Sequence, residues 1–266
     1  MKRLFVILAA VAGLALPSAA AATTAPAPAA ATPCVTSDTG GNCGPYFDPQ
    51  MVNSSGYNTY VENNAWGCGA PGSCGRQTLT SYGPAHWSVT SSQAAGNTGV
   101  LTYPNVAQIL TATTNVDPPI ASFKYLHSAF AESMPGPGTG TDAEAGYDIW
   151  TSGGPRSQTG EVMIWTQNVN RGTGGSKVLL NHTFNRQTFT LMQYGGYRGE
   201  LIWWLRHNET SGTVHIKAML KWLMNHGYLA AHARIAQVDF GWEICSTGGH
   251  PRQFSVTRYN LLAKRQ

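Results

Sequence analysis

Short segments rich in β-branched and aromatic residues recur along the whole chain, and turns of glycine, proline and asparagine separate them. These segments span residues 57–67, 77–82, 87–90, 100–103, 121–126, 144–151, 161–168, 178–184, 187–194, 201–207, 233–245 and 253–262. Many short strands at such spacing predict an all-β sandwich or barrel. The apolar fraction of 42% is enough for a sizeable core and excludes intrinsic disorder of the body of the chain.

Only one stretch has the periodicity of a helix. Between Thr213 and Gly227 the apolar residues fall at i, i+3, i+4 and i+7, namely Ile216, Met219, Leu220 and Leu223. Ser211 or Thr213 is expected to cap the start of this helix, and Gly227 is expected to end it. We expect the helix to lie against one sheet as a brace.

The N-terminal region reads as a targeting segment. Two basic residues precede an apolar run over residues 4–16, and an A-x-A cleavage pattern follows, which predicts a secretory signal peptide over residues 1–22. The run is too short for a membrane span. Residues 23–33 are an Ala/Thr/Pro-rich tether, and residues 34–266 are the expected folded domain. We therefore expect a secreted, extracellular protein that has no membrane association after signal removal.

Charge is scarce and nearly balanced. Charged residues are 11% of the chain and the formal charge is +4, which falls to +2 when Lys2 and Arg3 leave with the signal peptide. Such a small net positive charge argues against a nucleic-acid partner. Zinc-protease, nucleophile-elbow and phosphate-loop motifs are absent from the sequence, so we expect neither metal nor cofactor.

The five cysteines fit a secreted protein in which four are paired and one is free. They are Cys34, Cys43, Cys68, Cys74 and Cys245. Four cysteines allow three pairings, and spacing alone does not choose among them. The spacing also lacks the closely spaced pairs and nearby histidines of a zinc site.

Two carboxylates stand out when the strands are read with a period of two. In residues 161–165 (EVMIW) the even positions are aliphatic and face the core, so Glu161 and Trp165 face the other way. In residues 236–244 (AQVDFGWEI) the even positions are all apolar, which puts Glu243 on the opposite face. Two such carboxylates suit glycoside hydrolysis, with one nucleophile and one acid/base. The alternative is that each glutamate decorates a solvated sheet face.

A tryptophan and an amide lie close together in an earlier segment. Alternation along the expected strand puts Trp66 on one face with Asn64 and Glu62, while Val61 points to the core. An aromatic plate beside an amide can pack against a sugar ring and bond its hydroxyls. Core packing of Trp66 is the alternative.

Several motifs in this order resemble glycoside hydrolase family 12, the small secreted endo-β-1,4-glucanases. The motifs are NNAWG at 63–67, TYPNV at 102–106, GYDIW at 146–150 and EVMIW at 161–165, followed by Glu243. The resemblance runs from about Cys43 to Leu262. It implies a β-jelly roll of two curved antiparallel sheets with a glucan-binding cleft on the concave face.

The resemblance also implies roles for single residues. Glu161 matches the family nucleophile, Glu243 the acid/base, and Asp148 the carboxylate that hydrogen-bonds the nucleophile. The carboxyl groups of Glu161 and Glu243 should then be about 5 to 5.5 Å apart, as retention of configuration requires. Four further residues match substrate-binding positions, namely Asn64, Trp66, Met163 and Trp165.

The family pattern implies a disulfide between Cys43 and Cys74, which leaves Cys34 to pair with Cys68. Two residues after the acid/base the family usually has an aromatic residue, whereas this chain has Cys245. By alternation Cys245 shares the face of Glu243, so we expect a free thiol at the rim of the cleft.

The resemblance thus implies a secreted, monomeric, retaining endoglucanase acting on internal β-1,4 bonds of cellulose and mixed-linkage β-glucan. Two alternatives stay open: a xyloglucan-specific endoglucanase, and a non-catalytic jelly roll that binds glucan. A related-fold xylanase is disfavoured, because the Asn-Asn-x-Trp and Glu-x-Met-x-Trp strings follow the glucanase pattern. Low charge suits a neutral polymer as the partner.

Overall fold

The computed structural model describes residues 32–37, 41–47, 57–68, 74–111, 116–152, 160–172, 177–194 and 200–266. These residues belong to one unit, Thr32–Gln266. The expected signal peptide and residues 23–31 of the expected tether lie outside the described residues, so both stay predictions. In the part of the chain that is described, no helix is long and apolar enough to cross a membrane.

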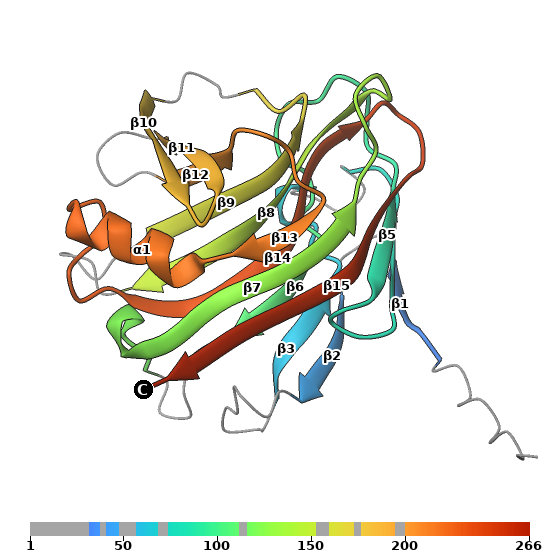
Figure 1. Ribbon diagram of the computed structural model, residues 1–266. Helices are drawn as coiled ribbons and strands as arrows, with labels where there is room; N and C mark the ends of the chain where they lie inside the picture. Colours follow the sequence, from blue (N-terminus) through green and yellow to red (C-terminus); the bar gives the residue numbers. More distant parts are fainter. Residues whose placement is uncertain are drawn as a thin grey trace, which may run out of the picture. The chain divides into compact units, whose positions relative to one another are not determined.

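The described strands form two sheets, which confirms the all-β prediction (Figure 1). The six-stranded sheet has the order β1 (Cys34–Ser37), β4 (Gln77–Ser81), β5 (Trp87–Ser91), β15 (Arg252–Arg265), β7 (Phe123–Ser133) and β13 (Ser211–Val214). The nine-stranded sheet has the order β10 (Lys177–Phe184), β11 (Gln187–Gln193), β12 (Leu201–Leu205), β9 (Gly160–Val169), β8 (Thr141–Ser152), β14 (Arg234–Thr247), β6 (Asn105–Ile109), β3 (Tyr57–Glu62) and β2 (Asn42–Phe47).

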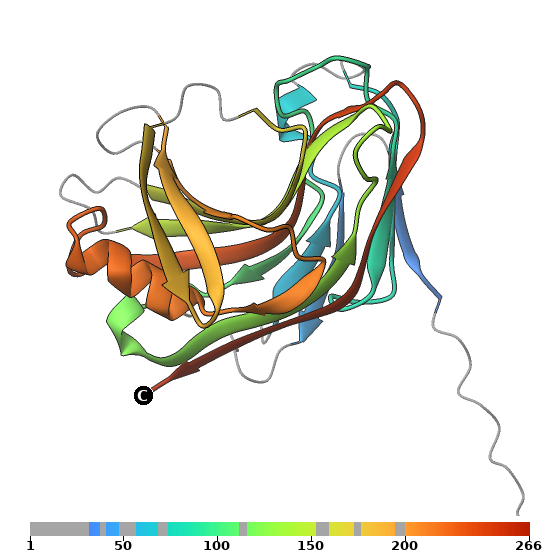
Figure 2. The same cartoon turned by 45° about the horizontal axis from the view of Figure 1, so that its top comes forward.

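The two sheets pack as a jelly-roll sandwich, and the larger one is strongly curved (Figure 2). Neighbouring described strands are antiparallel except for β9 and β12, which run parallel. One face of the nine-stranded sheet packs on the six-stranded sheet. We call the opposite face, which is turned away from the six-stranded sheet, the outer face.

The predicted alternation is confirmed by burial for β9 and for β14 from Val238 to Ile244, whereas a bulge at the start of β14 puts Ile235 in the core cluster instead of the predicted Ala236. Val162 and Ile164 belong to the main core cluster, together with Phe240 and Trp242. Trp242 packs edge-on against Trp87 of the six-stranded sheet, with 5.0 Å between ring centroids. Burying a large apolar side chain stabilises a fold by about 1.5–3 kcal/mol, so these contacts fix which face of each strand points inward.

One core contact includes a carboxyl group. Trp242 Nε1 donates a hydrogen bond of 3.0 Å to Glu132 Oε2 on β7. Burial raises the pKa of Glu132 to about 7, although the tryptophan hydrogen bond partly opposes the shift. Glu132 is therefore a buried acid between the sheets, separate from the outer face.

The sequence pattern missed four strands, namely β1, β2, β6 and β13. Instead of a strand over residues 100–103, the structure has an isolated bridge between Thr102 and Ile244, and β6 begins at Asn105. Pro104 has no amide hydrogen to donate, so the continuous ladder starts after it. The expected strand over residues 57–67 ends at Glu62, and a 3-10 turn, η1 (Trp66–Cys68), follows.

Helix α1 (Ile216–Asn225) buries the four apolar residues that its periodicity predicts. It contacts β7 of the six-stranded sheet, and its Trp222 packs on Trp203 of the nine-stranded sheet at 5.4 Å, so it braces both sheets. The capping prediction was wrong. Ser211 and Thr213 lie in β13, which pairs with β7, and the N-cap His215 makes no side-chain capping bond. Gly227, with φ of +76°, follows the helix as predicted.

One further element completes the described fold. The 3-10 turn η2 (Ile120–Ser122) leads into β7, and its Ile120 is buried against the core. Gly227 donates its backbone N–H to Met224 O at 3.2 Å, which closes the end of α1.

The four predicted disulfide cysteines are paired, but the implied pairing was wrong. Cys34 bonds Cys43, with 5.9 Å between Cα atoms, and Cys68 bonds Cys74, with 5.2 Å between Cα atoms. The paired cysteines are separated by nine positions in the first bond and by six in the second, so each cysteine is bonded to its nearest neighbour in sequence. The first bond joins edge strands of different sheets, because β1 belongs to the smaller sheet and β2 to the larger.

Replacing both Cys34 and Cys43 by alanine should lower the free energy of unfolding by about 2–3 kcal/mol, because the unfolded chain loses a loop constraint. Urea unfolding of the oxidised proteins measures this change. A loss below about 0.5 kcal/mol would contradict a stabilising loop constraint from this bond.

Candidate functional site

Three central strands of the nine-stranded sheet carry the predicted catalytic residues on the outer face. Asp148 on β8 lies opposite Met163 on β9 and opposite Asp239 on β14. Residues that face one another across a ladder share a face, and alternation then places Glu161 and Trp165 on it too. β8 therefore holds Asp148 between the strands that carry the two glutamates.

The strand register sets the positions of Glu161 and Glu243 relative to Asp148. On β8, Trp150 lies opposite Glu161 and Glu144 lies opposite Glu243. Asp148 therefore lies on β8 between the residue that faces Glu161 and the residue that faces Glu243. The three carboxyl groups still act on one another, because the charges of Glu161 and Glu243 both raise the pKa of Asp148. The 5 to 5.5 Å separation stays a prediction.

The surroundings of Asp148 favour its protonated, neutral form. It is 7% exposed, and no described donor reaches its Oδ1. Burial raises its pKa to about 9, and the charges of Glu161, Asp239, Glu243 and Glu200 add to that shift. A protonated Asp148 can donate a hydrogen bond to an ionised neighbour.

Glu161 is half-buried at the start of β9. Burial raises its pKa, and the charge of Glu243 raises it further. Protonation of Asp148 removes one negative charge from the surroundings of Glu161. Of Asp148 and Glu161, Glu161 is therefore the better placed to ionise. An ionised carboxylate on an aromatic-lined sheet face can act as a nucleophile.

Sequence reasoning missed Glu200. It directly precedes β12, whose Leu201 pairs with Val162, so Glu200 lies level with Glu161 on the neighbouring strand. Burial raises the pKa of Glu200 to about 8, and the charges of Glu161 and Glu243 contribute. Nothing in the local pattern marks this residue, because its position depends on a parallel ladder between distant segments.

Sequence reasoning also missed Arg171, which directly follows the bridge after β9. Its Nη2 lies 3.3 Å from Glu243 Oε2, and its Nε lies 3.3 Å from Glu144 Oε2. Its Nη1 lies 4.0 Å from Asp142 Oδ1, and the guanidinium carbon is 5.9 Å from the centroid of Trp165. The predicted acid/base thus has a cationic partner.

Cys245 is free, as predicted, but its expected place at the cleft rim was wrong. The side chain is fully buried, and Arg171 donates from Nη1 to its Sγ at 2.7 Å. Burial raises the pKa of this thiol to about 12, so it stays protonated at physiological pH. A β-bulge between Ile244 and Ser246 turns this part of β14.

Met163 and Trp165 lie on the predicted face but are each only 1% exposed. They pack with Met192 and Ile202 into a second apolar cluster, separate from the main core. Trp204 lies against this cluster, with its ring 6.4 Å from that of Trp165. Both residues therefore form the floor of the outer face rather than an open aromatic plate.

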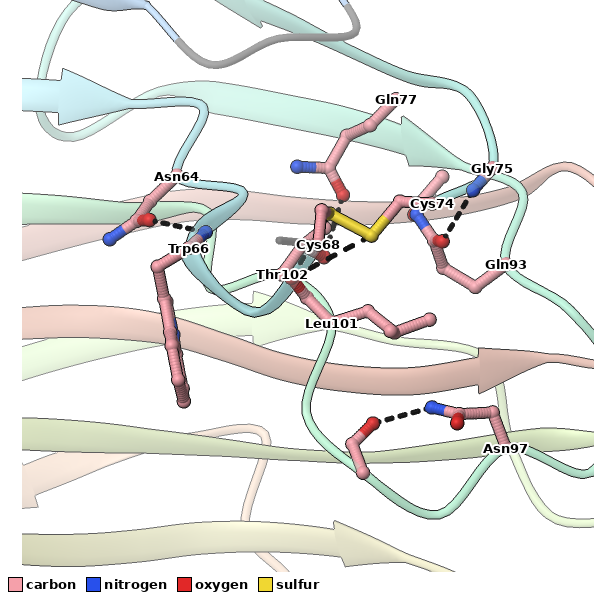
Figure 3. The surroundings of a disulfide bond; sticks show 12 residues. Asn64, Trp66, Cys68, Cys74, Gly75, Gln77, Gln93, Asn97, Leu101 and Thr102 are labelled. Atoms are coloured by element: carbon pink, nitrogen blue, oxygen red, sulfur yellow. Dashed lines mark hydrogen bonds between the residues drawn. A yellow bond between two sulfur atoms is a disulfide. The ribbon is translucent and has the colours of Figure 1, made fainter. Parts of the chain in front are cut away.

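Trp66 is the more exposed of two open tryptophans, the other being Trp150 on the outer face opposite Glu161. Because β3 ends at Glu62, Trp66 lies on η1 and not on a strand, which corrects the expected shared strand face. Asn64 Oδ1 accepts a 3.0 Å hydrogen bond from the Trp66 backbone N–H, and the indole ring points away from the Cys68–Cys74 disulfide (Figure 3). At 63% exposure, Trp66 is not packed in the core.

Among the described residues, no group of three or more histidine, cysteine, aspartate or glutamate side chains is arranged to hold a metal ion. The acidic groups of the outer face instead contact one another, amides and Arg171. Gln237 Nε2, for example, donates to both carboxylate oxygens of Asp239 at 2.8 Å.

Comparisons with known proteins place this architecture among glycoside hydrolases. No family model matches the sequence, and no curated protein matches it either. Solved structures do match. The xyloglucanase domain of NopAA, a type three effector from Sinorhizobium fredii, in complex with cellobiose, is 25% identical, with a TM-score of 0.60 over 78% of this chain and 93% of that chain.

Two further structures align over more of the chain. Endoglucanase 3 of Trichoderma harzianum, from family GH12, is 20% identical, with a TM-score of 0.68 over 87% of this chain and 98% of that chain. The family 12 xyloglucanase from Bacillus licheniformis, in complex with ligand, is 17% identical, with a TM-score of 0.67 over 87% of this chain and all 100% of that chain.

Two curved sheets, a bracing helix and an acidic outer face define a β-jelly roll of the glycosidase type. More narrowly, the chain has the fold of glycoside hydrolase family 12.

Replacing Asp148 by asparagine should flatten the pH dependence of stability between about pH 4 and pH 9. The folded state holds the Asp148 proton up to about pH 9, whereas the unfolded state releases it near 3.8, so rising pH costs stability in this window. The variant should lose up to about 1.4 kcal/mol per pH unit of that slope. Urea unfolding at several pH values tests this, and equal slopes would contradict it.

Proposed function

We propose that this protein is a secreted, retaining endo-β-1,4-glucanase that acts as a monomer on cellulose and mixed-linkage β-glucan, with no cofactor. Residues 1–22 are removed on secretion, 23–33 form a tether, and 34–266 form the catalytic domain. The observation that carries the proposal is the grouping of Glu161, Asp148 and Glu243 on the outer face of a family 12 fold.

The mechanism follows from the charges of the three carboxyl groups. Ionised Glu161 attacks the anomeric carbon, while Glu243 gives a proton to the departing glycosidic oxygen. Asp148, which holds its proton, donates a hydrogen bond to Glu161 and so keeps a second negative charge away from the nucleophile. Water activated by Glu243 then releases the glycosyl-enzyme with net retention.

The glucan chain is held by apolar surface and amide groups. Trp66 offers an exposed ring for the C–H face of a glucose unit, and Asn64 sits beside it. Met163 and Trp165 form the floor under the reacting sugar. Because a neutral polymer gains little from long-range charge, the acidic residues of this face serve chemistry rather than attraction.

A xyloglucan-specific endoglucanase is the second candidate. It is favoured by the structure comparison, in which the 25% identical match is a xyloglucanase domain and the Bacillus licheniformis match is a xyloglucanase. Release of reducing sugar from barley β-glucan, carboxymethylcellulose, xyloglucan and xylan, measured side by side, decides between them. Activity on xyloglucan alone would replace the first candidate by the second, and binding without hydrolysis would leave a glucan-binding jelly roll.

Glu161→Gln should lower kcat on the best substrate by at least about 1,000-fold, because the amide cannot form the glycosyl-enzyme. The fold should survive, since Glu161 lies at the start of β9 and outside both apolar clusters. Glu209→Gln is a matched control, because it makes the same chemical change away from the outer face. Glu209 accepts a hydrogen bond from Gln187 Nε2. Normal activity of the Glu161 variant would overturn the assignment.

A further inference from the structure

Glu144 is a buried acid beside Glu243 that the proposed mechanism does not use. The two residues lie directly opposite one another on β8 and β14, so their side chains share the outer face. Glu144 is fully buried. A carboxyl group in such a place costs considerable free energy unless it is neutral or well paired.

The partners of Glu144 do not suffice for an ionised carboxylate. Arg171 Nε approaches Glu144 Oε2 at 3.3 Å, but in the described part of the chain no aligned hydrogen-bond donor reaches either oxygen. The same guanidinium contacts Glu243 Oε2 through Nη2 at 3.3 Å. Two adjacent carboxyl groups thus share one cation, and a proton on Glu144 would supply the missing donor.

We propose that Glu144 is a positioning residue that shares one proton with Glu243, and that Arg171 anchors the pair. The inference rests on the proposed function, in which Glu243 is the acid/base. In the resting state Glu144 carries the proton and donates a hydrogen bond to ionised Glu243. Burial and the charge of Glu243 both raise the pKa of Glu144, as this arrangement requires.

The proton balance of one catalytic cycle is simple. The proton moves from Glu144 to Glu243 along their hydrogen bond and then to the glycosidic oxygen, which leaves both carboxylates ionised beside Arg171. The water that releases the glycosyl-enzyme gives its proton to Glu243, which restores one proton to the pair. Arg171 stabilises the doubly ionised stage, because its guanidinium contacts both groups.

Other titratable groups surround Glu243 on every neighbouring element. They are Asp142 and Asp148 on β8, Glu161 on β9, Arg171 after β9, Tyr103 before β6, Glu200 before β12 and Cys245 on β14. Among these, only Arg171 lies within 4.0 Å of the Glu243 carboxyl as an ion pair in the described part of the chain. The nearest determinants of its proton are therefore Glu144 and Arg171.

The pH profile of kcat/KM tests the pair through two opposite shifts. Glu144→Gln keeps a hydrogen-bond donor to Glu243 but cannot carry the negative charge that Glu144 acquires when the pair loses its proton, so the alkaline limb should move to lower pH by about one unit. Arg171→Met removes the cation that favours ionised Glu243, so the limb should move to higher pH by about one unit. A merely structural role would change the height of the profile without these opposite displacements.

Glu132→Gln is the matched control for the profile. Glu132 is also a buried acid with a raised pKa, but it lies between the sheets against Trp242. Its substitution should leave the alkaline limb in place. The proposal would be overturned if the alkaline limbs of Glu144→Gln and Arg171→Met both coincide with that of the wild type, or if both move in the same direction.

A second measurement needs no turnover. Carbon-13 labelling of the side-chain carboxyls of the seven glutamates lets the Glu144 resonance be followed by NMR in the wild type and in Glu243→Gln. Glu144 should stay protonated to a higher pH in the wild type than in that variant. Titration of Glu144 near 4.5 in the wild type would overturn the pair even in an active enzyme, whereas an inactive wild type would overturn only the proposed function.

Discussion

The packing of one face of the nine-stranded sheet on the six-stranded sheet is the constraint on which the site depends. Side chains alternate strictly along a strand, so burying Phe240 and Trp242 of β14 between the sheets forces Asp239 and Glu243 outward. A slip of one residue would reverse both faces at once. The core therefore positions the carboxyl groups without contacting them.

The same arrangement concentrates acid on one face. Seven of the chain's 13 acidic residues act on one another there, namely Glu62, Glu144, Asp148, Glu161, Glu200, Asp239 and Glu243. Among the described residues, the three ion pairs within 4.0 Å all involve Arg171. Excess negative charge in a partly buried place is relieved mainly by protonation, so several of these groups hold protons near neutral pH. The clustering of buried acidic groups lowers the stability of the fold, but it provides protonated carboxyl groups that can act as acids in catalysis.

The sequence predicted the faces of β9 and β14 because the alternation of apolar residues is a local property. It could not predict that Glu144 would meet Glu243, since that depends on the register of two strands about 100 residues apart, with bulges at Ile235 and Ile244. Arg171 reaches the site from beyond the end of β9, and Glu200 enters through a parallel ladder. The predicted disulfide pairing was wrong for a related reason, because it came from a family pattern and not from the positions of β1 and β2 at the edges of the two sheets.

A glycine on β14 explains how a tyrosine enters the middle of this acidic group. Gly146 and Gly241 lie opposite one another on β8 and β14. A Cβ atom at Gly241 would lie 2.0 Å from Pro104 O, so only glycine lets the chain before β6 pass this close. Tyr103 then donates from its hydroxyl to Gly146 O at 3.4 Å. Burial and the charges of four nearby carboxyl groups raise its pKa, so the phenol stays neutral and adds no further negative charge to the acidic face.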